Sequence, residues 1–304
     1  MMKKQTRIAL FGGDTRQIFL AKRLLEDGFL PQIWGLGAPA EERLAGLAFR
    51  DWREALEGTE VLMLPLPVST DGVRLNTPLQ GEASLRLSLL AERFCGKLVL
   101  GGRIPQSLRG LFEEKAIPCE DYYESEILQL KNALPTAEGA IFVAMGELSV
   151  TLDGCRTAVV GYGRIGSLLS EKLAALGADV TVLARRRESL ETAALRRHRG
   201  LFLDPTDPFL GLQALPQDLR VIFNTVPSRI FTKEMLDRIP KGCLFIDLAS
   251  APGGIDFSAA EEKGIRTIWA TALPGKYSPE TAGIILAQTA EALLEPLEQY
   301  SDFP

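Results

Sequence analysis

The sequence predicts an α/β protein with two Rossmann-like domains, each built on a doubly wound parallel sheet, and a cleft between them. Three observations support this fold class. The length of 304 residues suggests two domains rather than one. Short apolar strands alternate with amphipathic helices in both halves of the chain, which is typical of parallel sheets with right-handed crossovers. A G-x-G-x-x-G motif lies between a strand and a helix in the second half.

The composition excludes several classes of protein. Hydrophobic residues make up 46% of the chain and the net charge is −5, which argues against general nucleic-acid binding. The first residues lack the apolar region of a signal peptide, and no run of about 18 apolar residues occurs, so we expect a cytoplasmic protein that does not enter a membrane. The four cysteines are widely scattered and the chain has one histidine, so no metal site is expected.

Residues 1–134 form the first predicted domain. A strand over 7–11 enters the segment Gly12-Gly13-Asp14-Thr15-Arg16, and a helix follows to Glu26. Further strands are expected at 32–35, 61–66 and 97–100, and helices at 53–56, 83–94 and 106–115. The glycine spacing after the first strand is incomplete, so we assign no nucleotide to this domain.

Polar residues follow two strands of this domain, where ligands of such sheets bind. Asp14 and Arg16 come after the first strand, and Ser69 and Thr70 come after the strand at 61–66. We expect these four residues to contact the carboxylates of a small acidic substrate. Two simpler interpretations remain open, namely a capped helix start at Asp14 and a turn over 69–72.

A helix linking the domains is predicted to begin near Pro135, because proline is favoured in the first turn of a helix. It would run to about residue 148, with Thr136 and Glu138 in its first turn. Glu138 then either interacts with the positive end of the helix dipole or faces the cleft as a base or polar anchor. The dipole interpretation is preferred.

Residues 135–278 comprise this helix and a predicted dinucleotide-binding domain. A strand over 157–160 enters Gly161-Tyr162-Gly163-Arg164-Ile165-Gly166, a helix follows, and a second strand covers 179–183. Gly161 permits the tight turn, Gly163 lets the backbone approach a pyrophosphate, and Gly166 lets helix and strand pack closely. The helix N-terminus, with Arg164 and Ile165, then offers N–H groups to the phosphates.

The end of the second strand indicates which dinucleotide binds. NAD sites usually place an acid there for the ribose 2′-hydroxyl, but this chain has Arg185 and Arg186 and no acid. Two guanidinium groups suit a 2′-phosphate, so we predict that NADP is preferred over NAD. The alternative is a solvated basic loop at the start of a helix.

Later strands are predicted at 219–224, 244–247 and 266–269, and a final helix over 279–300 is expected to pack back on the first domain. In this fold Thr225, Val226 and Pro227 would lie under the nicotinamide ribose. Lys276 would approach the cleft as a catalytic or substrate-binding group, although a solvent-exposed lysine is an equally good interpretation.

The only histidine, His198, lies at the polar end of a helix beyond the second strand of the dinucleotide unit. We expect it to be a cation at the helix C-terminus, away from the nicotinamide. A 2-hydroxyacid dehydrogenase needs a histidine acid–base beside the hydride, so this chain lacks the usual machinery for that reaction.

Several segments together resemble the A subunit of bacterial dipicolinate synthase, and the resemblance spans nearly the whole chain. These segments are GGDTRQ at 12–17, PVSTDG at 67–72, NALPTAEG at 132–139, VVGYGRIG at 159–166, NTVPS at 224–228, DLASAPGGIDF at 247–257 and LPGKYSPETAG at 273–283. The resemblance implies oxidation of a dihydrodipicolinate-type ring to dipicolinate with NADP⁺ during spore formation, alongside the B subunit of that enzyme. A homo-oligomer is also expected.

This reaction suits the available residues, because the enzyme must mainly align the ring and hold its two carboxylates. Arg16, Ser69, Thr70, Thr136 and Lys276 are the candidates for binding the dianion, and Glu138 is the candidate for accepting a proton. Two other functions remain open. One is a different NADP-linked reductase of the shikimate-dehydrogenase type, and the other is a non-catalytic partner subunit that binds NADP.

Overall fold

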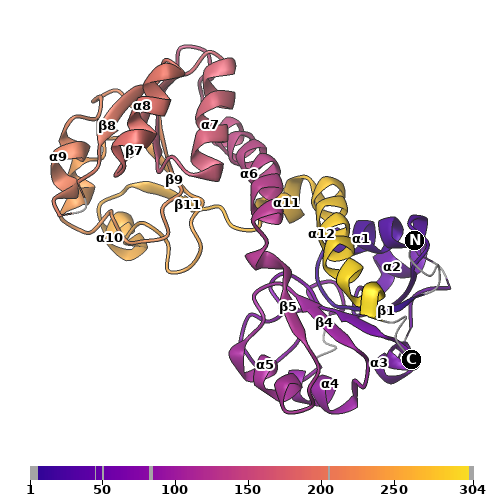
Figure 1. Cartoon of the computed structure of the whole chain (residues 1–304). Helices are drawn as coiled ribbons and strands as arrows, with labels where there is room; N and C mark the ends of the chain where they lie inside the picture. Colours follow the sequence, from indigo (N-terminus) through magenta and orange to yellow (C-terminus); the bar gives the residue numbers. More distant parts are fainter. Residues whose placement is uncertain (1–5, 45, 50, 82–84, 205, 301–304) are drawn as a thin grey trace. The chain divides into compact units, whose positions relative to one another are not determined.

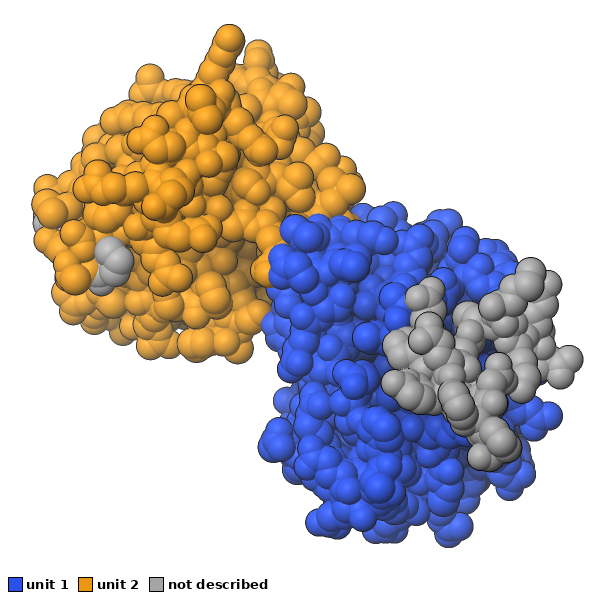
Figure 2. Space-filling view, viewed as in Figure 1, with its two compact units in different colours: residues 1–132, 278–304 blue, residues 133–277 orange. Residues whose placement is uncertain are grey.

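The computed structural model describes residues 6–300, apart from residues 45, 50, 82–84 and 205 (Figure 1). The chain divides into two compact units, coloured separately in Figure 2. Unit 1 comprises Met1–Asn132 and Ser278–Pro304, and unit 2 comprises Ala133–Tyr277. Within the described residues, no helix combines the length and apolar character that a membrane span requires.

Unit 1 contains a fully parallel five-stranded sheet in the order β2-β1-β3-β4-β5. Its strands are β1 (Arg7–Phe11), β2 (Leu30–Trp34), β3 (Val61–Met63), β4 (Leu98–Gly101) and β5 (Cys119–Asp121). Its helices are α1 (Thr15–Glu26), α2 (Gly37–Arg43), α3 (Trp52–Leu56), α4 (Leu87–Arg93), α5 (Gln106–Glu113), the 3₁₀ turn η1 (Tyr122–Glu124) and α12 (Pro279–Tyr300). The strand order reverses between β1 and β3, and ligands of such sheets bind beyond the carboxyl ends of the strands at this switch point.

Both faces of the unit 1 sheet are covered, which explains why the sequence of β1 is a continuous run of apolar residues after Arg7. Ile8 and Leu10 belong to the core beneath α1 and α12, whereas Ala9 and Phe11 belong to the core on the α3–α5 side. Helix α12 packs closely against α1, because a Cβ added at Gly283 would stand 2.5 Å from the carbonyl oxygen of Arg16. The final helix is therefore part of unit 1.

The linking helix starts earlier than predicted. Helix α6 (Glu126–Glu147) contains Pro135 in its interior, so the predicted start at Pro135 is wrong. A proline inside a helix removes one backbone hydrogen bond and costs about 3 kcal/mol. Burial of Leu128, Ala133 and Ala137 on the same helix offsets this cost, since each is at most 1% exposed.

Unit 2 contains a fully parallel six-stranded sheet in the order β11-β10-β9-β6-β7-β8. Its strands are β6 (Arg156–Val160), β7 (Asp179–Ala184), β8 (Arg199–Phe202), β9 (Val221–Asn224), β10 (Leu244–Asp247) and β11 (Arg266–Trp269). Its other elements are α7 (Arg164–Ala175), α8 (Arg187–Leu195), α9 (Pro208–Gln213), the 3₁₀ turn η2 (Met235–Arg238), α10 (Phe257–Glu262) and α11 (Leu273–Tyr277). Counted from β8, this is the strand order of the Rossmann dinucleotide-binding fold.

The predicted fold class of two parallel-sheet α/β domains is confirmed. Most predicted strands differ from the observed ones by one or two residues at an end. The largest difference is the strand predicted at 61–66, which ends at Met63 because Pro65 and Pro67 follow. The helix predicted over 83–94 begins at Leu87, and residues 83 and 84 lie outside the described part of the chain.

Candidate active site

The glycine loop of unit 2 has the geometry of a dinucleotide-binding turn. Gly161 follows β6 with φ of +94°, a conformation that favours glycine. A Cβ at Gly166 would stand 2.1 Å from the Gly161 carbonyl oxygen, so only glycine allows α7 to pack this closely on the loop. The Thr225 hydroxyl donates to the Val160 carbonyl at 2.9 Å and supports the loop from below.

Gly163 differs from its two neighbouring glycines because the space around it is open. It is the N-cap of α7, and a Cβ built there would meet no atom within 4 Å. Arg164 and Ile165 begin the helix directly after it. The first-turn N–H groups of α7 therefore adjoin open space, an arrangement that suits a pyrophosphate at a helix N-terminus.

A basic corner follows β7, made of Arg185 and Arg186. Both arginines are exposed, and Arg186 is the N-cap of α8. The next residue, Arg187, places its guanidinium carbon 5.2 Å from the ring centroid of Phe202, and Glu188 lies in the first turn of α8. The corner thus presents two exposed guanidinium groups where NAD-specific Rossmann folds place a carboxylate.

A buried amide–carboxylate pair organises the loops after β9 and β10. Asn224 and Asp247 are neighbours in the sheet register, both fully buried, and Asn224 Nδ2 donates to Asp247 Oδ1 at 2.9 Å. Asp247 also accepts from the backbone N–H groups of Ala249 at 3.0 Å and Gly254 at 2.6 Å. Asn224 in turn bonds the carbonyl and the N–H of Val226, which fixes the segment that carries the predicted nicotinamide-side residues.

Neither Asn224 nor Asp247 was among the residues predicted from the sequence to form the site. A signal was present, because each residue is the polar end of an otherwise apolar strand, VIFN for β9 and LFID for β10. Thr225 and Val226 are half-buried directly after β9, and Pro227 is exposed. Contact of these three residues with a cofactor stays a prediction.

At the carboxyl edge of the unit 1 sheet, Asp14 and Arg16 form a partly buried ion pair. Arg16 Nε and Nη2 each lie 2.8 Å from the Asp14 carboxylate, which also caps α1 by accepting from the Arg16 backbone N–H at 3.1 Å. Arg16 Nη2 further donates to the Leu66 carbonyl at 2.7 Å. The pair therefore joins the loops after β1 and β3 at the switch point, and the capping interpretation of Asp14 is confirmed.

Ser69 forms a turn after β3, as the simpler interpretation of this segment predicted. Its hydroxyl lies 2.6 Å from the Arg74 carbonyl and accepts from the Gly72 N–H at 2.9 Å. The Asp71 carboxylate accepts from the backbone N–H groups of Val73 and Arg74, and these hydrogen bonds lower the pKa of that carboxyl. Thr70 is exposed beside this turn.

The three remaining predicted residues lie in unit 2. Thr136 is buried on α6. Glu138 is in the middle of that helix and forms an ion pair with Lys172 at 2.9 Å, so the helix-dipole interpretation of Glu138 is wrong. Lys276 is exposed on α11, next to Tyr277, whose ring centroid lies 4.8 Å from that of Phe142. Catalytic roles for Glu138 and Lys276 stay predictions, as does the cleft expected between the domains.

His198 differs from its prediction. It is only 7% exposed and its ring centroid lies 6.5 Å from that of Tyr162. Burial lowers the pKa of His198, and the positive charge of Arg196 lowers it further. His198 does lie just beyond the C-terminus of α8, but it is buried beside Tyr162 of the glycine loop, and this surrounding disfavours the positive charge that was expected on it.

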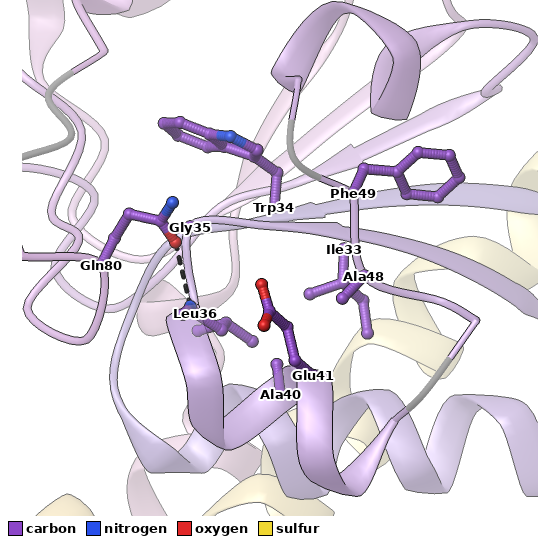
Figure 3. A pocket seen from close by; sticks show the side chains of 10 residues that line it. Ile33, Trp34, Gly35, Leu36, Ala40, Glu41, Ala48, Phe49 and Gln80 are labelled. Atoms are coloured by element: carbon purple, nitrogen blue, oxygen red, sulfur yellow. Dashed lines mark hydrogen bonds between the residues drawn. The ribbon is translucent and has the colours of Figure 1, made fainter.

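Unit 1 also contains a cavity of about 240 Å³ beyond the carboxyl end of β2 (Figure 3). Glu41 directs its carboxylate into it from α2, and Gln80 lies opposite, with its Oε1 accepting from the Gly37 N–H at 2.9 Å. No predicted site residue lines this cavity. Over the described parts of both units, no group of histidine, cysteine and acidic residues could hold a metal ion.

Comparison with known proteins identifies relatives over almost the full length of the chain. Residues 7–123 match the model of the N-terminal domain of the dipicolinate synthase A subunit, and residues 157–234 match the TrkA-N domain model. The dipicolinate synthase A subunit of Bacillus subtilis (strain 168) is 30% identical over 300 residues, covering 96% of this chain and 97% of that protein.

Two solved structures are similar to the whole chain. One is the dipicolinate synthase A subunit from Bacillus halodurans, with a TM-score of 0.84 and 28% identity, covering 97% of this chain and 99% of that one. The other is the dipicolinate synthase A chain from Bacillus subtilis, with a TM-score of 0.82 and 27% identity, covering 98% of each chain.

Proposed function

Because the chain belongs to the family of dipicolinate synthase A subunits, we propose that it is an NADP-dependent oxidoreductase that converts a dihydrodipicolinate-type ring to dipicolinate. The observation that carries this proposal is that a member of this family has an intact glycine loop in unit 2. In that loop Gly163 leaves open space at the N-terminus of α7. The work of the chain is then to bind the cofactor, to hold a dicarboxylate, and to align the two.

The cofactor fits the residues of unit 2. The first turn of α7, with Gly163, Arg164 and Ile165, would bind the pyrophosphate, and Gly161 and Gly166 would shape the loop. Thr225, Val226 and Pro227 would contact the nicotinamide ribose. When bound, the nicotinamide supplies a hydride acceptor.

Arg185 and Arg186 support NADP as the preferred form. A guanidinium binds phosphate oxygens through paired hydrogen bonds and keeps its charge at all physiological pH values. Both side chains are exposed at the end of β7, and no acid occupies the position that would select the 2′-hydroxyl. A 2′-phosphate is therefore the group that this corner suits.

Unit 1 is proposed to hold the substrate at the carboxyl edge of its sheet. Arg16 would contribute charge from the switch point, and Ser69 and Thr70 would contribute hydroxyl groups. From unit 2, Thr136 and Lys276 would complete the binding of the dianion, and Glu138 would accept a proton.

The chemistry needs little from a side-chain base. Oxidation would remove one hydride and one proton from the ring, with Glu138 or water as the proton acceptor, and would leave the ring aromatic. Because aromatisation favours the product, the chief contribution of the enzyme is positioning, which can supply up to about 7–11 kcal/mol of the barrier. We also propose that the chain forms a homo-oligomer and acts together with the B subunit of dipicolinate synthase.

A spectrophotometric assay tests this proposal. The purified chain is mixed with NADP⁺ and chemically generated dihydrodipicolinate, and absorbance at 340 nm is followed with and without the B subunit. NADPH formation by the chain alone supports the proposal and excludes a non-catalytic role. Absence of NADPH formation under both conditions would overturn it.

Kinetics of variants test the substrate side separately. Arg16→Gln and Thr136→Val should raise KM or lower kcat for the dicarboxylate while NADP(H) binding stays intact. Arg23→Gln is a matched control, because Arg23 also forms an arginine–aspartate pair on α1, with Asp27 at 2.6 Å. Kinetics equal to the wild type in both test variants would refute these assignments.

A further inference from the structure

The cavity beyond the carboxyl end of β2 is lined by three separate segments of unit 1 (Figure 3). They are residues between 33 and 41, the pair Ala48 and Phe49, and Gln80. The Phe49 N–H donates to the Ile33 carbonyl at 2.8 Å, which joins the first two segments. The cavity volume of about 240 Å³ lies just below the roughly 300–1,000 Å³ of most small-molecule sites, so the cavity suits one small ligand.

Gly37 fixes the wall between α2 and Gln80. Its φ is +57°, and a Cβ built there would stand 2.4 Å from the Leu79 carbonyl oxygen, so only glycine lets the two segments lie this close. The Gly37 N–H donates to Gln80 Oε1 at 2.9 Å. This hydrogen bond orients the Gln80 amide, whose Nε2 group can only donate. The wall is therefore in place before any ligand binds.

Glu41 gives the cavity its charge. Among the ten described residues that line the cavity it is the only ionisable one, and it directs its carboxylate inward (Figure 3). No ion pair or hydrogen bond joins its side chain to another described residue. A carboxylate only accepts hydrogen bonds, and it repels anions. The cavity therefore suits a ligand that donates hydrogen bonds and carries no negative charge.

The place of this carboxylate in the fold indicates the class of ligand. In Rossmann folds that bind dinucleotides, an acid beyond the second strand accepts from the ribose hydroxyls. Glu41 supplies an acid to unit 1 from the helix that directly follows β2. Ile33, Leu36 and Ala40 line the same cavity with apolar side chains, which suit the flat base of a nucleoside.

The start of α1 excludes the phosphates of a dinucleotide. Asp14 is the N-cap of α1, whereas Gly163 is the N-cap of α7 in unit 2. The Asp14 carboxylate accepts from the Arg16 backbone N–H at 3.1 Å, so it occupies the helix end at which a pyrophosphate would bind. A nucleoside without phosphate is therefore the ligand that unit 1 suits.

We propose that the cavity beyond β2 binds an uncharged ribonucleoside. The 2′- and 3′-hydroxyls of the ribose donate to the Glu41 carboxylate, Gln80 Nε2 donates to the ligand, and the base packs on the apolar lining. This site is additional to the glycine loop of unit 2, and it does not depend on the proposed function.

Calorimetric titration of the full chain tests this inference with adenosine, guanosine, cytidine and uridine. Saturating NADP⁺ is present, so that the adenosine site proposed for unit 2 is filled. At least one nucleoside should bind, and its 2′,3′-dideoxy counterpart should bind about tenfold or more weakly. Its 5′-monophosphate should bind no more tightly than the nucleoside. Absence of binding by all four nucleosides, or tighter binding of the monophosphate, would overturn the inference.

Two alanine variants make the result specific to the cavity. Glu41→Ala should weaken nucleoside binding about tenfold or more and bring the ribose and dideoxyribose affinities together, because the hydroxyls then lack their acceptor. Glu42→Ala is the matched control, since Glu42 is the next exposed acid on α2 and does not line the cavity. It should bind as the wild type does. Alanine favours helix at both exposed positions, so both variants should fold normally.

The outcomes separate this inference from the proposed function. If Glu41→Ala keeps the wild-type preference for ribose over dideoxyribose, the nucleoside site is wrong, whether or not NADPH forms. If 1,4-diaminobutane binds and no nucleoside does, the cavity is a site for organic cations and the inference is again wrong. Nucleoside binding that depends on Glu41, in a chain that forms no NADPH, supports the inference while the proposed function fails.

Discussion

Alanine substitutions at Gly163 and Gly166 should separate cofactor binding from folding. A Cβ at Gly166 would stand 2.1 Å from the backbone oxygen of Gly161, whereas a Cβ at Gly163 would meet nothing within 4 Å. The first change therefore forces the loop and α7 apart. The second fills only the open space in which we place the pyrophosphate.

The magnitudes follow from these contacts. Overpacking against backbone costs about 1–3 kcal/mol, so Gly166→Ala should lower the unfolding midpoint by about 2–12 °C. At Gly163, alanine is a poorer N-cap but restricts the unfolded chain, and the two effects should nearly cancel, to within about 1 kcal/mol. Affinity for NADP⁺ should nevertheless fall at least about tenfold in Gly163→Ala, which corresponds to about 1.4 kcal/mol.

Circular dichroism during heating and calorimetric titration with NADP⁺ measure the two quantities. Wild-type affinity in Gly163→Ala would show that no phosphate approaches this loop, and the cofactor assignment would be lost. A wild-type midpoint in Gly166→Ala would show instead that the close packing of α7 on the loop is not as described.

Three other predictions concern unit 2. Serine at both Arg185 and Arg186 should weaken NADPH binding about tenfold or more and leave NADH binding unchanged in fluorescence titrations; equal losses would remove the 2′-phosphate assignment. Because the pKa of His198 is lowered in the folded state, the free energy of unfolding should fall as pH drops below about 6.5, and urea unfolding of His198→Gln should lack that loss. Asp247→Ala removes the acceptor of three buried N–H donors, those of Asn224, Ala249 and Gly254, and each loss costs about 1–3 kcal/mol. The unfolding midpoint of this variant should therefore fall by more than about 5 °C, and a smaller change would contradict the network.

The fold class could be predicted because its signals are local. Strands buried on both faces read as apolar runs, β1 and β10 for instance, and their predicted bounds match the structure. The glycine loop was equally readable, since its spacing depends on backbone geometry within one strand–turn–helix unit. Strands β5 and β8 were missed because they lie at sheet edges, where partly exposed residues leave no apolar pattern.

The candidate site was less predictable because its contacts join distant parts of the chain. The Arg16 hydrogen bond to Leu66 and the Asn224–Asp247 pair connect loops that only the sheet topology brings together. The helix start predicted at Pro135 was wrong for a different reason. Proline has a strong local preference for the first turn of a helix, but packing along α6 overrides that preference. His198 was misjudged because its polar neighbours in sequence hide the fact that its own ring is buried.

The most direct measurement uses dihydrodipicolinate that carries deuterium at its saturated ring carbons, incubated with NADP⁺ and this chain, with and without the B subunit. Mass spectrometry and NMR of the recovered nucleotide then report where the deuterium resides. We predict deuterium at C4 of the reduced nicotinamide, together with dipicolinate in equal amount. Dipicolinate formed without deuterium in the nucleotide, or no reduced nucleotide at all, would contradict it.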